Sequence, residues 1–211
     1  MVAELESQDN IRRRFIADAS HELRTQLSSI KILVQSLQST SNVPQEQLME
    51  LLGDVENEAD RLSELVNNLL ELTKIEGHRH QSIVYEHVQL TNLIKKVARR
   101  VQALADKKDI VLEMDLAEVS VQSDYSALFR IIHNLVDNAV KYTPGRGRIT
   151  ITLTSQHNKA VIVIRDTGIG IQKEHISSIF DRFYRVDSAR TGGQSGFGLG
   201  LALVKELCQI L

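Results

Sequence analysis

Apolar residues recur every three or four positions along the first third of the chain. One series comprises Phe15, Ala19, Leu23, Leu27, Ile30, Val34 and Leu37, and a second comprises Leu48, Leu52, Val55, Ala59, Leu62, Val66 and Leu69. This spacing places each series on one face of an α-helix. The polar segment STSNVP between them predicts a short loop, so the two helices should form an antiparallel hairpin. A lone hairpin leaves apolar surface exposed, and we therefore expect it to dimerise into a four-helix bundle.

The pattern changes near residues 75–81, where long helical periodicity gives way to shorter mixed segments. Downstream of this point, the sequence predicts helices over residues 90–105, 125–142, 173–180 and 200–210, and strands over residues 110–114, 148–154 and 160–166. The segment SQHN between the last two strands is typical of a β-hairpin turn. Helices that mix with an antiparallel hairpin favour an α+β sandwich over a doubly wound parallel sheet. We therefore predict a helical domain over residues 1–77 and an α+β domain over residues 82–211.

Composition and charge disfavour two classes of function, nucleic-acid binding and membrane insertion. The 211 residues are 42% hydrophobic and 25% charged, which is ordinary for a folded protein with one or two cores. The formal net charge of −2 provides no overall field that would attract nucleic acid, so any bound anion must be held by a local site. No apolar run in the sequence is long enough to span a bilayer. We expect no nucleic-acid partner and no membrane insertion by this chain.

Two glycine-rich segments and a pair of asparagines carry candidate chemistry in the second domain. The segment DTGIG, residues 166–170, ends a strand, and GFGLGLALVKEL, residues 196–207, leads a glycine-rich loop into a helix. Glycines allow the backbone to approach a ligand closely, and a helix N-terminus presents free N–H groups to phosphate. Asn134 and Asn138 lie one helical turn apart, so both amides can face a hydrated Mg²⁺ or a phosphate.

The two commonest nucleotide sites do not fit these glycines. A Rossmann fingerprint would need its third glycine where Leu201 stands. A P-loop would need a lysine followed by serine or threonine, which neither segment supplies. A nucleotide site here must therefore be of another type.

Five segments resemble, in the same order, the sequence boxes of the sensor histidine kinases of two-component systems. FIADASHELRTQL resembles the H box, NLVDNAVKYT the N box, RDTGIGI the first glycine box, IFDRFYRV the F box and GFGLGLALVKEL the second glycine box. The resemblance covers nearly the whole chain. It implies a homodimeric HisKA-type phosphotransfer hairpin followed by an α/β sandwich of the Bergerat (GHKL ATPase) type. Its implied activity is ATP-dependent autophosphorylation, transfer of the phosphoryl group to an aspartate of a response regulator receiver domain, and phosphatase action.

The resemblance also implies catalytic roles. His21 would be the phospho-acceptor; it lies off the apolar series, and a histidine side chain is largely neutral and nucleophilic at pH 7. Glu22 would accept the imidazole proton as the other ring nitrogen attacks the γ-phosphate. Thr25 would orient a hydrolytic water for the phosphatase reaction. Arg185 of the F box would bring a cation to the γ-phosphate.

For the nucleotide, ATP, the resemblance makes Asp166 the acceptor for the adenine amine and Asn138 the Mg²⁺ ligand. Asn134 would lie beside Asn138, with Lys141 near the phosphates and Tyr142 against the adenine. The remaining implied contacts to the nucleotide come from Gly168, Gly170, Gly196, Gly198, Gly200 and Leu201. The glycines would frame the pocket and hinge a lid, and Phe180 and Phe183 would pack that lid.

The sequence departs from the family's pattern at two places. Gln26 replaces the proline of the usual HELRTP, and this predicts a first helix that runs unbroken from about Ile11 to Gln38. The chain stops at KELCQIL, where the family continues through a glycine turn and two strands, so the second domain is expected to lack its C-terminal hairpin. The resemblance further implies the cytoplasmic portion of a membrane-anchored sensor whose sensor region is absent from this chain.

Two alternatives remain open at this point. One is an ATPase of the same fold that drives conformational work, although such a protein has no use for SHELRT on a dimerising hairpin. The other is a catalytically impaired scaffold, which the presence of His21, Asn138 and Asp166 disfavours.

Overall fold

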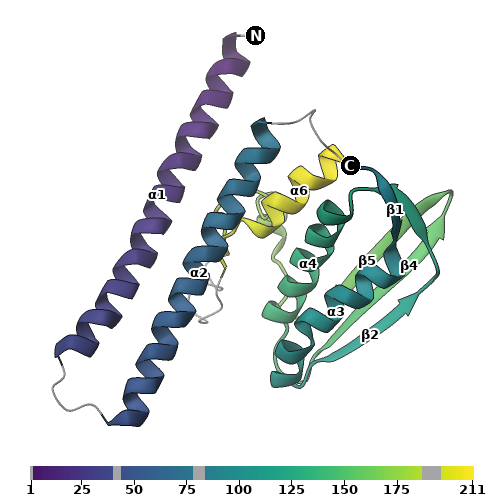
Figure 1. Cartoon of the computed structure of the whole chain (residues 1–211). Coiled ribbons are helices and arrows are strands. Elements are labelled where there is room, and N and C mark those ends of the chain that lie inside the picture. The colour runs from purple at the N-terminus through teal and green to yellow at the C-terminus, as the bar shows by residue number, and fades with distance from the viewer. Residues whose placement is uncertain (1, 40–43, 78–83, 187–195) are drawn as a thin grey trace. The chain divides into compact units, whose positions relative to one another are not determined.

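A computed structural model of the chain describes residues 2–39, 44–77, 84–186 and 196–211 (Figure 1). It divides into two compact units, Met1–Thr73 and Lys74–Leu211. Residues 40–43 of the predicted loop and residues 78–81 of the predicted boundary segment lie outside the described residues. The first unit is a helical hairpin and the second is an α/β domain, in agreement with the fold class that the sequence predicts.

The hairpin consists of α1 (Val2–Ser39) and α2 (Gln45–Gly77), which run in opposite directions (Figure 1). The helix α1 continues without a break past Gln26, as predicted, because glutamine keeps the backbone N–H that proline lacks. Phe15 and Ala19 of the first apolar series are buried. On α2 the fully buried side chains are Leu65 and Leu72, neither of which belongs to the predicted second series.

Many large apolar side chains on the hairpin remain exposed to solvent. Ile32 is 65% exposed and Met49 is 64% exposed. Among the residues whose side chains the structure describes, the exposed set on this unit is Ile16, Leu27, Ile32, Val34, Leu48, Met49, Leu52, Val66 and Leu70. An apolar surface of this kind is typical of a protein–protein interface.

The second unit contains a three-stranded mixed sheet with the order β2–β4–β5. β2 (Val111–Leu116) is parallel to β4 (Arg148–Gln156), which pairs antiparallel with β5 (Lys159–Asp166). His157 and Asn158 both have positive φ, at 49° and 61°, and join β4 to β5 as a two-residue turn. This is the hairpin that SQHN predicts, because such a turn requires left-handed residues at both positions.

Two helices cover one face of this sheet, α3 (Leu90–Lys107) and α4 (Tyr125–Tyr142) (Figure 1). Ile149, Ile151 and Leu153 alternate along β4 and are buried in the core between the sheet and the helices. The buried positions of α3 follow spacings of three and four residues, so one face of this helix meets the core. A further helix, α6 (Gly200–Ile210), packs against α4.

Sequence patterns missed or misassigned three short elements. β1 (Glu86–Gln89) and β3 (Ser120–Ser123) form a separate antiparallel pair that was not predicted. The helix predicted over residues 173–180 was wrong, because only a 3₁₀ helix, η1 (Lys173–His175), forms there and turns follow it. Ile176 and Phe180 stay exposed, so the segment has no buried apolar face that would stabilise an α-helix.

The end of α3 adopts a conformation that usually requires glycine. Asp109 has φ of 54°, in the left-handed region. The N–H groups of Lys108 and Ile110 both donate to the carbonyl of Ala105, at 3.0 and 2.9 Å. This arrangement closes the last turn of the helix, and a non-glycine residue in it is strained.

We expect Asp109→Gly to raise the free energy of unfolding by about 1 kcal/mol, because glycine relieves the left-handed strain. Denaturant unfolding followed by circular dichroism measures this. The control is Arg99→Gly at an exposed position inside α3, which should lower the same quantity by about 1 kcal/mol. If both substitutions destabilise equally, strain at Asp109 is not relieved by glycine.

Candidate functional site

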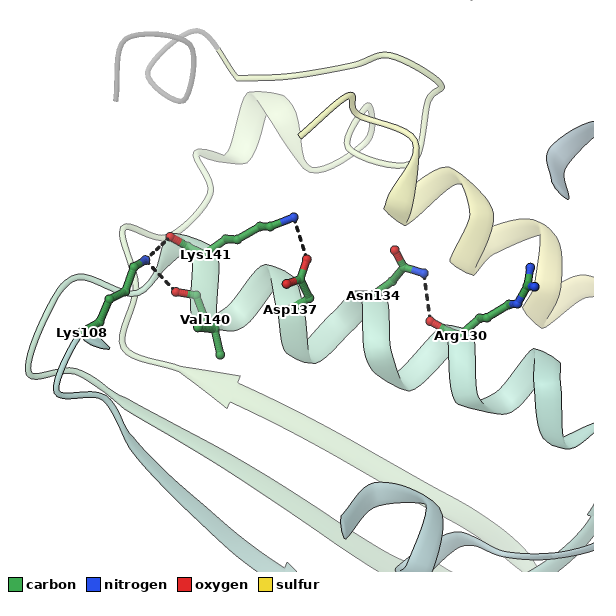
Figure 2. A network of polar contacts seen from close by, with 6 residues as sticks. All are labelled: Lys108, Arg130, Asn134, Asp137, Val140 and Lys141. Atoms are coloured by element: carbon green, nitrogen blue, oxygen red, sulfur yellow. Dashed lines mark hydrogen bonds and ion pairs between the residues drawn. The ribbon is translucent and has the colours of Figure 1, made fainter. Parts of the chain in front are cut away.

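One face of α4 presents a row of polar side chains (Figure 2). The helix begins at an N-cap, Asp124, whose Oδ1 accepts a hydrogen bond from the N–H of Ala127 at 2.9 Å. Asn134, Asn138 and Lys141 follow at spacings of four and three residues, so they share a face. The apolar positions of α4 pack into the core, so this polar face points away from the sheet.

Asn134 contacts the start of α6. Its Nδ2 donates to the carbonyl of Arg130 at 2.9 Å, and its Oδ1 would lie 2.8 Å from a Cβ built at Gly200. A Cβ at Gly200 would therefore require the Asn134 side chain to shift. The structure thus brings one predicted asparagine against one glycine of the second glycine segment. Partial burial lowers the pKa of the neighbouring Arg130 guanidinium, which nevertheless stays protonated at physiological pH.

Asn138 and Lys141 differ in how their polar groups are used. Asn138 is half-buried, and its amide makes no hydrogen bond with any residue that the structure describes. Lys141 Nζ forms an ion pair with Asp137 Oδ2 at 2.7 Å, and both side chains are largely buried. Sequence reasoning missed Asp137, although its i, i+4 spacing from Lys141 is a usable signal. Asn138 can therefore offer its oxygen to a ligand, while Asp137 fixes the direction of Lys141.

The turn after β5 meets the end of α4. Asp166 Oδ1 accepts a hydrogen bond from the N–H of Gly168 at 2.8 Å, and the carbonyl of Tyr142 accepts one from the N–H of Ile169 at 3.2 Å. A Cβ on Gly168 would lie 2.6 Å from Asp166 Oδ1 and 2.7 Å from the Tyr142 carbonyl oxygen, so this position requires glycine. Asp166 is exposed, and its Oδ2 has no hydrogen bond within the described part of the chain.

The F-box segment lies against the second glycine segment. Phe183 N–H donates to the carbonyl of Gly198 at 3.0 Å, and a Cβ on Gly198 would lie 2.6 Å from the Tyr184 carbonyl oxygen. Gly198 has φ of 70° and Phe183 has φ of 61°. His175 Nδ1 and Tyr184 Oη are 2.7 Å apart and hydrogen-bonded, which ties η1 to the same segment. Arg185 follows at once and is half-buried.

The other predicted contacts are less constrained. Gly170 has φ of 69°, and no atom of the described residues lies within 4 Å of a Cβ built there or at Gly196. Leu201 is half-buried in the first turn of α6. Phe180 is exposed, and the residues 187–195 that would complete a lid lie outside the described ranges.

The predicted catalytic residues of the H box lie together on α1, in the first unit. His21 is exposed and Glu22 is half-buried. Thr25 Oγ1 donates to the carbonyl of His21 at 3.0 Å. The imidazole of His21 is thus accessible to a reactant, and the hydroxyl of Thr25 is held one turn away.

Family models match both units. The model described as "His Kinase A (phospho-acceptor) domain" matches residues 11–78. The model described as "Histidine kinase-, DNA gyrase B-, and HSP90-like ATPase" matches residues 123–211. The first match contains His21 and the second contains the polar face of α4 and both glycine segments.

Individual proteins agree with these matches. The chain is 33% identical over 211 residues to the sensor histidine kinase WalK of Bacillus subtilis, covering 99% of this chain and 34% of WalK. The mycobacterial sensor histidine kinase MprB is 34% identical, with a TM-score of 0.51 over 60% of this chain and 79% of MprB. The Acinetobacter baumannii histidine kinase AdeS is 26% identical, with a TM-score of 0.74 over 90% of this chain and 87% of AdeS. The chain thus spans about a third of WalK.

The contact between Gly168 and Tyr142 yields a prediction about stability. We expect Gly168→Ala to lower the free energy of unfolding by roughly 1–3 kcal/mol, because its Cβ overlaps backbone that cannot move without breaking the turn. Thermal unfolding measures this. The matched control is Gly196→Ala, where a Cβ meets no atom within 4 Å and should change stability little. Equal unfolding temperatures for the two variants would contradict the tight packing at Gly168.

Proposed function

The chain belongs to the sensor histidine kinases of two-component systems, and we propose that it phosphorylates itself on His21 using ATP. The observation that carries this proposal is the pairing of two features. An exposed histidine, His21, lies in the phospho-acceptor match. In the ATPase match, Asn134 contacts Gly200 of the second glycine segment, and Asn138, one turn further along the same helix, has no hydrogen bond with any described residue.

The reaction at His21 is a phosphoryl transfer. One imidazole nitrogen attacks the γ-phosphorus of ATP, a P–N bond forms, the bond to the bridging oxygen breaks, and ADP leaves. Glu22 accepts the proton from the other ring nitrogen. The exposure of His21 supports this role, because the γ-phosphate must reach the ring. Thr25, held by its bond to the His21 carbonyl, would orient water for dephosphorylation.

Asp166 and Tyr142 form the adenine end of the proposed nucleotide site. Because Gly168 N–H occupies Asp166 Oδ1, the other carboxylate oxygen is available to accept from the adenine amine. Gly168 and Gly170 let the chain pass close to the base, and Tyr142 lies at the same end of α4.

The phosphate end of the proposed site comprises α4, α6 and the F box. Asn138 fits Mg²⁺, which prefers oxygen ligands and here meets a half-buried amide oxygen without a partner among the described residues. When bound, Mg²⁺ supplies charge neutralisation to the phosphates. Lys141 and Arg185 add positive charge, and Asn134 contacts the α6 start. The remaining contacts come from Gly196, Gly198, Gly200 and Leu201.

We propose two protein partners for the hairpin, a second copy of this chain and a response regulator. The exposed apolar side chains of α1 and α2 support a homodimer in which two hairpins form a four-helix bundle. The receiver domain of a response regulator would accept the phosphoryl group from His21 on an aspartate. The similarity to the sensor histidine kinase WalK supports a role as the cytoplasmic portion of a membrane-anchored sensor. No helix among the described residues has the length and apolar character needed to cross a membrane.

Incubation with γ-labelled ATP tests the proposal. We expect acid-labile, base-stable label on the protein, as for a phosphohistidine. Free phosphate without protein label would instead favour the conformational ATPase, and neither product would favour the scaffold.

We expect His21→Ala to abolish the protein-bound label and to leave ATP affinity within about twofold of wild type, because acceptor and nucleotide residues belong to different units. Label incorporation and calorimetry measure the two quantities. The control is His87→Ala, an exposed histidine on β1, which should keep the label. A His21→Ala variant that still carries the label would exclude His21 as the acceptor.

We expect Asp166→Asn to weaken ATP binding by about tenfold or more, from the loss of a charge-assisted hydrogen bond of roughly 1.5–3 kcal/mol. Because Gly168 N–H holds the Oδ1 position, the new amide nitrogen would face the adenine amine, donor against donor. Inosine triphosphate carries a carbonyl there, so the ratio of ATP to inosine triphosphate affinity should fall. Calorimetry with both nucleotides checks this, with the exposed Asp115→Asn on β2 as control. An unchanged ratio would place the base elsewhere.

A further inference from the structure

Lys108, which follows α3 in the chain, reaches the C-terminal end of α4. Its Nζ donates to the carbonyls of Val140 at 2.9 Å and Lys141 at 2.8 Å (Figure 2). The carbonyl of Thr143 lies 3.4 Å from the same nitrogen. The side chain is half-buried, so these bonds are partly shielded from solvent. One ammonium group thus meets three carbonyl oxygens at the end of a helix.

This placement has a clear physical rationale. The last four carbonyls of an α-helix have no partner within the helix, and that end carries a partial negative charge. An ammonium group has three hydrogen-bond donors for the unpaired carbonyls, and its full positive charge is attracted to the partial negative charge of the helix end. Lys108 is therefore a C-terminal cap for α4 supplied by a distant segment.

The main chain of Lys108 also binds the loop between α4 and β4, residues 143–147. Its carbonyl accepts a hydrogen bond from the N–H of Arg146 at 2.9 Å. A Cβ on Gly145 would lie 3.2 Å from that carbonyl oxygen, so the loop passes close over it. The loop between α4 and β4 is thus fixed by both the side chain and the backbone of one residue.

The turn that Lys108 holds is also the turn that meets the first glycine segment. Tyr142 lies between Lys141 and Thr143, and its carbonyl accepts the hydrogen bond from Ile169 N–H. Gly168 packs on the same carbonyl and donates to Asp166. A shift of this turn would therefore move the carboxylate that we assign to the adenine.

We propose that Lys108 is a positioning residue for the nucleotide: by capping α4 it sets the place of the Tyr142 carbonyl, and through it of Gly168 and Asp166. This inference rests on the proposed function. Lys108 acts through the backbone of α4 and does not itself touch ATP. It extends the nucleotide site to a residue outside all five sequence boxes.

The test measures ATP affinity of the whole chain by calorimetry in a graded series, Lys108→Arg, Lys108→Gln and Lys108→Met. We expect Lys108→Met, which keeps the length but removes every donor, to weaken ATP binding by about tenfold. Arginine should restore most of the affinity and glutamine part of it, in order of remaining donors. Should the methionine variant fail to fold, the ATP affinities of the arginine and glutamine variants still show whether affinity follows the number of remaining donors. The charge control is Lys107→Met at the neighbouring exposed lysine, which should bind ATP as wild type does.

Amide hydrogen exchange distinguishes a local change at this turn from a general loss of stability, because it reports the exchange rate of each N–H group separately. Lys108→Met should speed exchange selectively at Ile169 and Thr143, whose N–H groups bond to Tyr142 and Ala139. The stability control is Val101→Ala, which removes buried methyl groups of α3 away from this turn and should lower the unfolding temperature without changing ATP affinity.

The outcomes separate the two proposals. Lys108→Met with wild-type ATP affinity, or with an affinity loss matched by Val101→Ala, would overturn the role of Lys108. Absence of ATP binding by the wild-type chain would overturn the proposed function and, with it, the nucleotide role of Lys108. The exchange rate at Ile169 would still show whether Lys108 fixes the turn.

Discussion

The carbonyl oxygen of Tyr142 joins the end of α4 to the turn after β5. It accepts a hydrogen bond from Ile169, and it lies so close to Gly168 that no side chain fits there. Two segments that are distant in the chain thus share one fixed point. The polar face of α4 and the carboxylate of Asp166 therefore keep a defined relation, and these are the two ends of the proposed nucleotide site.

Hydrophobic periodicity predicted the elements that bury a continuous face. The helices α3 and α4 and the strands β4 and β5 have apolar positions at helical or alternating spacing, and these positions form the core. β1 and β3 escaped prediction because each is four residues long and contributes a single buried position, Val88 or Ser123, so neither shows a period. On α2 leucines occupy more than one face, and sequence spacing alone did not distinguish Leu65 and Leu72 from their neighbours.

The candidate site divides in the same way. Candidate residues within the boxes, such as Asn134, Asp166 and Gly168, could be predicted from the sequence because box order and spacing are local properties, and their roles stay predictions. The structure then supplied reasons for the glycines, such as the approach of Gly200 to Asn134. Lys108 could not be found, since a cap delivered from another helix leaves no periodic trace, and its contact with α4 exists only in the folded chain.

Both ends of α4 are held by side chains rather than by the helix alone. At the start, Asp124 accepts from Ala127 N–H and also, at 3.3 Å, from the N–H of Val84, the first residue of the described range 84–186. At the far end Lys108 holds the last carbonyls. Both anchors lie outside the helix, and its central residues Ile132 and Val136 are buried in the core. The helix α4 is therefore expected to move as one rigid body, so a displacement of Val84 at its start would also shift Asn134, where α4 touches the start of α6.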